Sequence, residues 1–330
     1  MTPAEEQRIR DFNNEIAGDN IKIIIERSDL PQSMEIEAFG KKLIHLLPSA
    51  AIKMETAEDN TSFPAVILGN ALHYHAVPLG KELDPFLEAL KMSADTSGTY
   101  VSQIAKRLAN LNSVALFDIF ITSQCPHCPL TVKTFVPLCF ASHLIRVSII
   151  DAALFPEAAA TRNVRSVPTT LLDESFRWTG AIDLDEIINI IKKRDPAHLS
   201  TESLKKMLHE GLAGKVAEMM VQKGFIFSNF IELLCHPKWT VRLGAMVTIE
   251  ELAAQDSKLA AQVEKPLWNR FFDLDDSVKG DMLHVLGETG NGETLIKLDS
   301  VLKESYNNDI QEAAGEAMEA IRRRLAVKGT

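Results

Sequence analysis

The first 195 residues alternate between short apolar runs and longer stretches in which apolar residues recur every three or four positions. The runs at 21–25 and 114–121 are rich in β-branched residues, which is typical of buried strands. The stretch at 100–111 places Ile104 and Leu108 on one side of a helix. This part of the chain is therefore predicted to adopt an α/β fold.

The predicted elements follow a similar order twice. The first set comprises a helix at 5–16, a strand at 21–25, a helix at 34–47, a strand at 50–55, a hairpin at 63–77 that turns at Gly69 and Asn70, and a helix at 82–92. The second set comprises a helix at 100–111, a strand at 114–121, a helix from near Pro126 that Pro137 should kink or end, a strand at 144–150, a helix at 155–162, strands at 166–172 and 176–178, and a helix at 183–193.

After Pro196 the pattern is helical only, and it contains a repeat. The stretches 239–245, 276–282 and 308–314 are similar in outline, and their equivalent residues Val241, Val278 and Ile310 lie 37 and 32 residues apart. Periods of this length indicate stacked helix pairs, and the motifs resemble HEAT repeats. Such arrays form extended surfaces, so we expect this region to dock a partner protein or to stabilise the rest of the chain.

Composition narrows the possible functions. The chain has 330 residues, with 46% hydrophobic and 24% charged residues, as in globular proteins of two or three domains. A net charge of -10 argues against nucleic acid as a partner. We expect no membrane span and no signal peptide, because apolar runs of the required length are missing. Four cysteines do not make a disulfide framework, so a cytoplasmic location is predicted.

Cys125 and Cys128 lie two residues apart between a predicted strand and a predicted helix. Thiols at this spacing can carry out dithiol–disulfide exchange. A helix start presents free backbone N–H groups and a positive dipole end, which should stabilise a thiolate at Cys125. Pro126 suits the first helical turn, and a protonated His127 would make the disulfide more oxidising.

Two other interpretations of this cysteine pair stay open: half of a zinc site, and two inert cysteines. No second pair of cysteines or histidines completes a zinc site, so no metal is predicted. Cys139 follows Cys128 by eleven residues, about 16 Å along a helix, which is too far for a disulfide. We expect Cys139 and Cys235 to be structural, and His73 and His75 to share a strand face without binding metal.

The Cys-Pro-His-Cys motif, followed some forty residues later by Val167-Pro168-Thr169, resembles the active-site pair of the thioredoxin family. The resemblance implies a cis peptide bond before Pro168, with Val167 and Pro168 forming a backbone platform for an extended substrate. It also implies that Cys125 attacks the substrate and that Cys128 resolves the mixed disulfide.

Asp118 is the candidate for the base that takes the proton from the resolving thiol. Single-domain thioredoxins carry a buried carboxylate six residues before the first cysteine, where this chain has Ile119. Relatives that contain two thioredoxin-like units carry an acid one position earlier, and that position is Asp118 in this chain. The other interpretation is a surface aspartate at the strand edge.

The first 95 residues contain no cysteine but resemble a thioredoxin-like unit, with Phe63-Pro64-Ala65-Val66 similar to its cis-proline strand. The Leu79–Leu83 stretch is similar to the first half of two-unit protein disulfide oxidoreductases and of the amino-terminal module of the alkyl hydroperoxide reductase flavoprotein. The predicted domains are therefore 1–95, a thioredoxin-like unit without cysteines; 96–196, the redox unit; and 198–330, a HEAT-like helical domain.

The predicted function is thiol–disulfide exchange on a protein disulfide or dithiol. No dinucleotide-binding motif is present, so no cofactor is predicted, and electrons should come from a reductase or a small thiol. The alternative is a redox-sensing scaffold whose helical repeat binds a partner protein.

Overall fold

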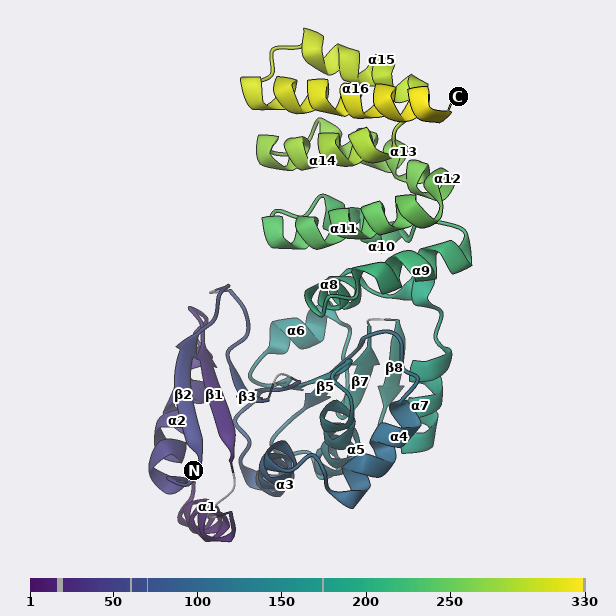
Figure 1. Ribbon diagram of the computed structural model, residues 1–330. Helices are drawn as coiled ribbons and strands as arrows, with labels where there is room; N and C mark the ends of the chain where they lie inside the picture. Colours follow the sequence, from purple (N-terminus) through teal and green to yellow (C-terminus); the bar gives the residue numbers. More distant parts are fainter. Residues whose placement is uncertain (17–19, 60, 70, 174, 329–330) are drawn as a thin grey trace. The chain divides into compact units, whose positions relative to one another are not determined.

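The computed structural model describes residues 1–16, 20–59, 61–69, 71–173 and 175–328 (Figure 1). The chain forms two compact units, Met1–Arg194 and Asp195–Thr330. The predicted boundary between residues 95 and 96 falls inside the first unit, and the division into three domains stays a prediction.

The first half of the first unit begins with a capped helix. Thr2 and Glu5 form a reciprocal capping box at its start, which satisfies free N–H groups of the first turn. Its elements are α1 (Pro3–Glu15), β1 (Lys22–Arg27), α2 (Ser33–Leu46), β2 (Ala51–Thr56), β3 (Ala65–Leu68), β4 (Leu72–His75), the 3-10 helix η1 (Gly80–Glu82) and α3 (Leu83–Ala94).

The second half has the same order with one more helix. Asp183 caps its last helix by accepting from two backbone N–H groups. Its elements are α4 (Thr99–Leu108), β5 (Ala115–Ile121), α5 (Cys128–Ala141), β6 (Ile145–Asp151), α6 (Pro156–Thr161), β7 (Thr169–Leu172), β8 (Phe176–Thr179) and α7 (Leu184–Lys193).

All eight strands belong to one mixed sheet in the order β2-β1-β3-β4-β6-β5-β7-β8. In each half two parallel strands are followed by an antiparallel hairpin. The halves join where β4 pairs in parallel with β6, from Leu72 opposite Val147 to His75 opposite Ile150. The predicted α/β fold with a mixed sheet and flanking helices is confirmed.

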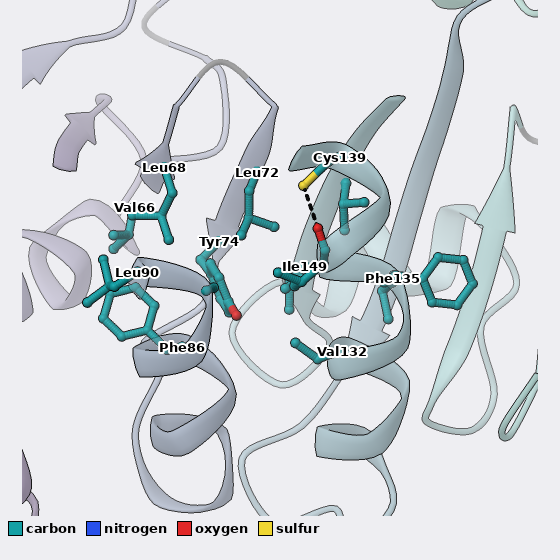
Figure 2. Packing of buried hydrophobic residues seen from close by; sticks show 14 of the residues in the cluster. Val66, Leu68, Leu72, Tyr74, Phe86, Leu90, Val132, Phe135, Cys139 and Ile149 are labelled. Carbon is teal, nitrogen blue, oxygen red and sulfur yellow. Dashed lines mark hydrogen bonds between the residues drawn. The ribbon is translucent and has the colours of Figure 1, made fainter. Parts of the chain in front are cut away.

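The two halves share one hydrophobic core across this junction (Figure 2). Tyr74 of β4 packs edge-on against Phe86 of α3, with ring centroids 5.4 Å apart. On the other side of the junction Phe135 of α5 packs edge-on against Phe117 of β5 at 4.9 Å. Tyr74, Phe86, Phe117 and Phe135 are fully buried, so neither half has a complete core of its own.

β5 separates two layers of this unit. Phe117 and Ile119 point to the layer that contains α5 and the cysteines, whereas Phe120 packs with Phe155 in a second cluster that includes α6. This alternation follows from the two-residue period of a strand.

The structure corrects three details expected from the sequence. The helix after β5 begins at Cys128 rather than near Pro126, because residues 122–125 form a turn and residues 126–127 a bend before it, and Pro129 supplies the proline of the first helical turn. Pro137 does not end this helix, which continues to Ala141 because buried residues hold both sides of the proline in the core. Phe63–Pro64 is not cis, unlike Val167–Pro168. The predicted turn residue Asn70 lies outside the described residues.

The second unit is helical throughout its described part, as predicted. Its elements are η2 (Pro196–His198), α8 (Thr201–His209), α9 (Ala213–Lys223), α10 (Ser228–Leu234), α11 (Trp239–Gln255), α12 (Ser257–Ala260), η3 (Ala261–Val263), α13 (Glu264–Phe271), α14 (Asp276–Thr289), α15 (Gly292–Lys303) and α16 (Asn308–Lys328). Within this unit α11, α14 and α16 run side by side (Figure 1).

Equivalent positions of the sequence repeat are buried in successive helices. Val241, Val278 and Ile310 are each at most 3% exposed, on α11, α14 and α16. A buried ion pair also joins two of these helices: Arg242 donates to the Asp281 carboxylate at 2.6 Å. The repeated motif thus marks the contacts between neighbouring helices.

No helix within the described residues combines the length and the apolar composition that crossing a bilayer requires.

The shared core generates a stability prediction. Phe86→Ala should lower the free energy of unfolding by about 3–5 kcal/mol, because it leaves a cavity where both halves meet. Amides of β5 and β6, in the other half, should then exchange hydrogen faster. The control is Met34→Ala, whose side chain is 72% exposed and should change stability by less than about 0.5 kcal/mol. Faster exchange confined to the first half would contradict a shared core.

Candidate active site

The two cysteines of the Cys-Pro-His-Cys motif lie at the junction of β5 and α5. The Cys125 N–H donates to the Thr122 carbonyl at 3.1 Å, which closes a turn after β5. Cys128 is the first residue of α5, and its N–H donates to the Cys125 Sγ at 3.1 Å. A free N–H of the helix start therefore points at the sulfur where negative charge would develop.

The two thiols differ in access. The Cys125 residue is 7% exposed, and Cys128 is fully buried behind it. Pro126 and His127, between them, are exposed at the surface. This arrangement lets an incoming disulfide approach Cys125 first.

The loop before β7 lies beside Cys125. The Val167–Pro168 peptide bond is cis, and the Val167 carbonyl oxygen is 3.8 Å from the Cys125 Sγ. Thr169 fixes the loop by donating from its hydroxyl to the Ser166 carbonyl at 2.7 Å. Two segments far apart in the sequence are thus brought to one site.

A hollow of about 380 Å³ adjoins this loop. Most of its lining residues are small and apolar, and Thr122 and Val167 connect it to the cysteine site. The remaining lining residues come from the segments around α6: Ala152, Ala153, Pro156, Ala159, Ala160, Val164, Arg165 and Ser166.

Glu82 is a candidate site residue that the sequence analysis missed. It ends η1 in the cysteine-free half and is only 2% exposed, and neither of its carboxylate oxygens has a hydrogen-bond partner. Burial raises the pKa of Glu82 to about 7, and the negative charge of Asp151 adds to the shift.

The charge of Glu82 affects the ionisation of Cys128. The pKa of the Cys128 thiol is raised, first by burial, next by its hydrogen bond with Cys125, and in smaller part by the Glu82 charge. A buried carboxylate that titrates near neutral pH thus lies within electrostatic reach of a buried thiol that holds its proton firmly.

The turn that carries Glu82 is fixed against the active-site loop. Gly80 has φ +62°, and a Cβ added there would lie 3.6 Å from the Ser123 carbonyl oxygen. The Gly80 N–H donates at 2.7 Å to Glu5 of α1. A glycine suits this position because L-residues with a side chain seldom adopt this conformation.

The structure does not bring Asp118 to the dithiol. Its neighbours Phe117 and Ile119 point to the layer of the cysteines, so the Asp118 side chain points to the opposite layer. There it pairs with Arg162 at 3.4 Å. Strand alternation at this position is undisturbed, which is why the acid seven residues before Cys125 faces away.

The remaining cysteines lie apart from this site. Cys139 is buried in the shared core, where its thiol donates to the Val136 carbonyl at 3.1 Å (Figure 2). Cys235 belongs to the second unit. Within the described residues no group of three or more histidine, cysteine or acidic side chains is placed to hold a metal ion.

One signal in the sequence could have pointed to Glu82. Glu82 is an acidic residue in the mainly apolar segment from Val77 to Leu83, and the apolar neighbours could have indicated that its side chain is buried. Its proximity to a thiol 46 residues later depends on the pairing of β4 with β6, which no local pattern reveals.

Titration of Glu82 should make stability depend on pH. In the unfolded chain its carboxyl loses its proton near 4.5, but in the folded chain the pKa of Glu82 is about 7. Between these values the folded state binds more protons, so its stability falls as pH rises. Glu82→Gln removes this loss and should be more stable than wild type by about 3 kcal/mol at pH 8, with the difference disappearing below pH 4.5.

Urea unfolding of both proteins from pH 4 to pH 8 measures this difference. Glu88→Gln on α3 is the matched control, because this carboxylate is 48% exposed and pairs with Lys133 at the surface. A Glu82→Gln stability that runs parallel to wild type at every pH would show that Glu82 is not buried in its charged form.

The candidate active site lies in a segment that matches a known protein family. Residues 116–192 match the model of the thioredoxin domain family. The matched segment contains both cysteines of the motif and Pro168.

Two curated relatives carry the same name. The F subunit of alkyl hydroperoxide reductase from Pseudomonas aeruginosa is 21% identical over 172 residues, which cover 51% of this chain and 33% of that protein. Its counterpart from Staphylococcus aureus strain Mu50 is 20% identical over 177 residues, covering 53% and 34%. The chain thus spans about a third of the length of the curated relatives it matches.

A solved structure shows the same fold. The C503A mutant of the alkylhydroperoxide reductase F protein (AhpF) of Enterococcus faecalis matches with a TM-score of 0.51 and 17% identity, covering 58% of this chain and 99% of that one. The chain thus contains a thioredoxin-like domain and is similar to the amino-terminal module of AhpF, as the resemblance drawn from its sequence predicted.

Proposed function

We propose that this protein is a thiol–disulfide oxidoreductase that acts on protein disulfides through Cys125 and Cys128. The observation that carries the proposal is the hydrogen bond from the Cys128 N–H to the Cys125 Sγ, beside the Val167 carbonyl. It gives Cys125 a donor for developing charge and a neighbouring backbone segment against which an extended substrate can lie.

The reaction proceeds in two displacements. The Cys125 thiolate attacks one sulfur of the substrate disulfide, forms a mixed disulfide and releases the other sulfur as a thiolate. Cys128 then loses its proton and attacks the Cys125 Sγ, which releases the second substrate thiolate and forms the Cys125–Cys128 disulfide. Two electrons pass to the substrate, and the reverse sequence oxidises a dithiol.

Glu82 accepts the proton of Cys128 in the second displacement. A buried thiol with a raised pKa is a poor nucleophile until a base removes its proton. Because the pKa of Glu82 is about 7, a large fraction of its carboxylates is free to accept that proton at neutral pH.

The substrate lies along Val167 and Pro168, and the hollow beside α6 receives one of its side chains. Pro126 and His127 are exposed at the rim of the site, where the imidazolium form of His127 favours the reduced dithiol.

Other proteins complete the cycle. An electron-donating reductase or a small thiol returns electrons to the dithiol, and the proposed steps need no organic cofactor or metal. The names of the curated relatives favour a peroxide-reducing partner as one acceptor of the electrons that the dithiol carries.

We further propose that the second unit forms a HEAT-like repeat and that the protein is located in the cytoplasm.

The test is to trap the mixed disulfide. Cys128→Ser should accumulate a covalent adduct with a protein disulfide substrate such as insulin, because Cys125 still attacks but nothing resolves the product. Cys125→Ser should form none. Adducts are counted on non-reducing gels, and turnover is followed as substrate thiols released with dithiothreitol as donor.

Cys139→Ala/Cys235→Ala is the control and should turn over at the wild-type rate. Turnover by Cys125→Ser would contradict the proposal. Partner binding that changes with oxidation, without any turnover, would instead favour the redox-sensing scaffold.

A second experiment separates the two carboxylates. Glu82→Gln should slow resolution of the mixed disulfide by about 10²-fold at pH 7, since it removes the proton acceptor. The rate should also lose its rise with pH near 7. Asp118→Asn is the matched control and should stay within about twofold of wild type, because Asp118 faces the opposite layer. Rapid quenching with a thiol-alkylating reagent measures both rates, and a slow Asp118→Asn with a fast Glu82→Gln would reverse the assignment.

A further inference from the structure

α11 presents two apolar sides rather than one. Its inner side is buried among the neighbouring helices through Val241, Ala245, Ile249 and Leu252. Trp239, Leu243 and Val247 follow one another at four-residue spacing along another side and are 55%, 39% and 38% exposed. Residues four apart lie on one helix face, so these three side chains form a continuous apolar stripe at the surface.

The corresponding positions of the next two helices are not apolar. Counting 37 residues onward along the repeat gives Asp276, Gly280 and His284 on α14, and counting 69 onward gives Asn308, Glu312 and Glu316 on α16. The apolar stripe is therefore a feature of α11 and not a consequence of the repeat. Exposed large apolar residues grouped in this way mark interaction sites more often than isolated ones do.

The stripe continues into a hollow on the neighbouring helices. Glu250, one turn beyond Val247, pairs with His284 of α14 at 3.7 Å between the Oε1 and Nε2 atoms. His284 also lines a hollow of about 350 Å³ between α14 and α16. At the floor of this hollow α14 and α16 approach each other closely, because Gly287 has no side chain and an added Cβ would lie 3.0 Å from the Ala317 Cα.

The hollow carries negative charge. Among the described residues that line it, the carboxylates of Glu288, Glu316 and Glu319 outnumber the single guanidinium, that of Arg323. All three carboxylates are exposed and therefore accessible to a ligand. An apolar stripe beside an acidic hollow is complementary to a segment that is apolar on one side and basic on the other.

We propose that α11, α14 and α16 bind a basic amphipathic segment of a partner protein. Its apolar side packs on Trp239, Leu243 and Val247, with the tryptophan as the main anchor. Its lysine or arginine side chains reach the carboxylates of the hollow. A second copy of this chain is a poor occupant, because a net charge of -10 makes copies repel each other.

The test uses a defined probe and the full-length chain. A labelled synthetic peptide of about 18 residues places leucines on one helix face and lysines on the other. A second peptide carries glutamate at every lysine position. Fluorescence anisotropy should show the lysine peptide binding at least about tenfold more tightly than the glutamate peptide, and less tightly as salt is raised.

Variants locate the binding face. Leu243→Asp and Val247→Asp should each weaken binding of the lysine peptide by about tenfold or more. Ile296→Asp on α15 is the matched control, because Ile296 is 75% exposed but lies outside the stripe, and it should bind as wild type. Glu316→Lys should weaken binding and its salt dependence, whereas Glu293→Lys on α15 should change neither. Circular dichroism establishes that each variant is folded.

Three results would overturn the proposal. The first is equal affinity for the lysine and glutamate peptides. The second is wild-type affinity for the lysine peptide in both Leu243→Asp and Val247→Asp. If only one of these variants folds, wild-type affinity in that variant overturns the proposal. The third is a dimer seen by sedimentation that Leu243→Asp disrupts, which would assign the stripe to a second copy of the chain.

Discussion

The parallel pairing of β4 with β6 is the interaction on which the active site depends. It joins two four-stranded sheets into one, so that Tyr74 and Phe86 of the first half share a core with Val132 and Phe135 of the second. Without it, η1 would have no fixed position beside the active-site loop, and Glu82 would lie in water. In the proposed reaction the cysteine-free half therefore supplies the proton acceptor, Glu82, for the Cys128 thiol of the other half.

The electrostatic design of the site costs stability and therefore needs a strong surrounding structure. A carboxylate and a thiol are buried within reach of each other, and the ionised form of either one is disfavoured. Such groups stay buried only where the nearby packing outweighs their desolvation. The shared aromatic core and the fixed turn at Gly80 provide that support. The carboxylate of Asp118 is instead partly exposed and pairs with Arg162 on the opposite layer.

Sequence reasoning succeeded where a local pattern is tied to a local geometry. The strands and the approach of Val167-Pro168 to Cys125 follow from short motifs or from a family resemblance built on them. Of the two outcomes expected at Pro137, a kink or a helix end, the structure excludes the end, because α5 continues to Ala141 within the buried core. Sequence reasoning missed Glu82, because a single sequence does not reveal that β4 pairs with β6. The burial of Glu82 depends on that pairing.

The shared sheet also has a consequence for inheritance. The predicted boundary between residues 95 and 96 resembles a point at which two genes could recombine, since a similar set of helices and strands lies on each side of it. A crossover there would separate Glu82 from the cysteines that it is proposed to serve, and each half alone would expose β4 or β6 as an unpaired strand edge, which favours aggregation. Chimeras that exchange one half with a distant relative should therefore be rare among viable descendants. The two halves, although each resembles a whole domain, are expected to be passed on together as one gene segment.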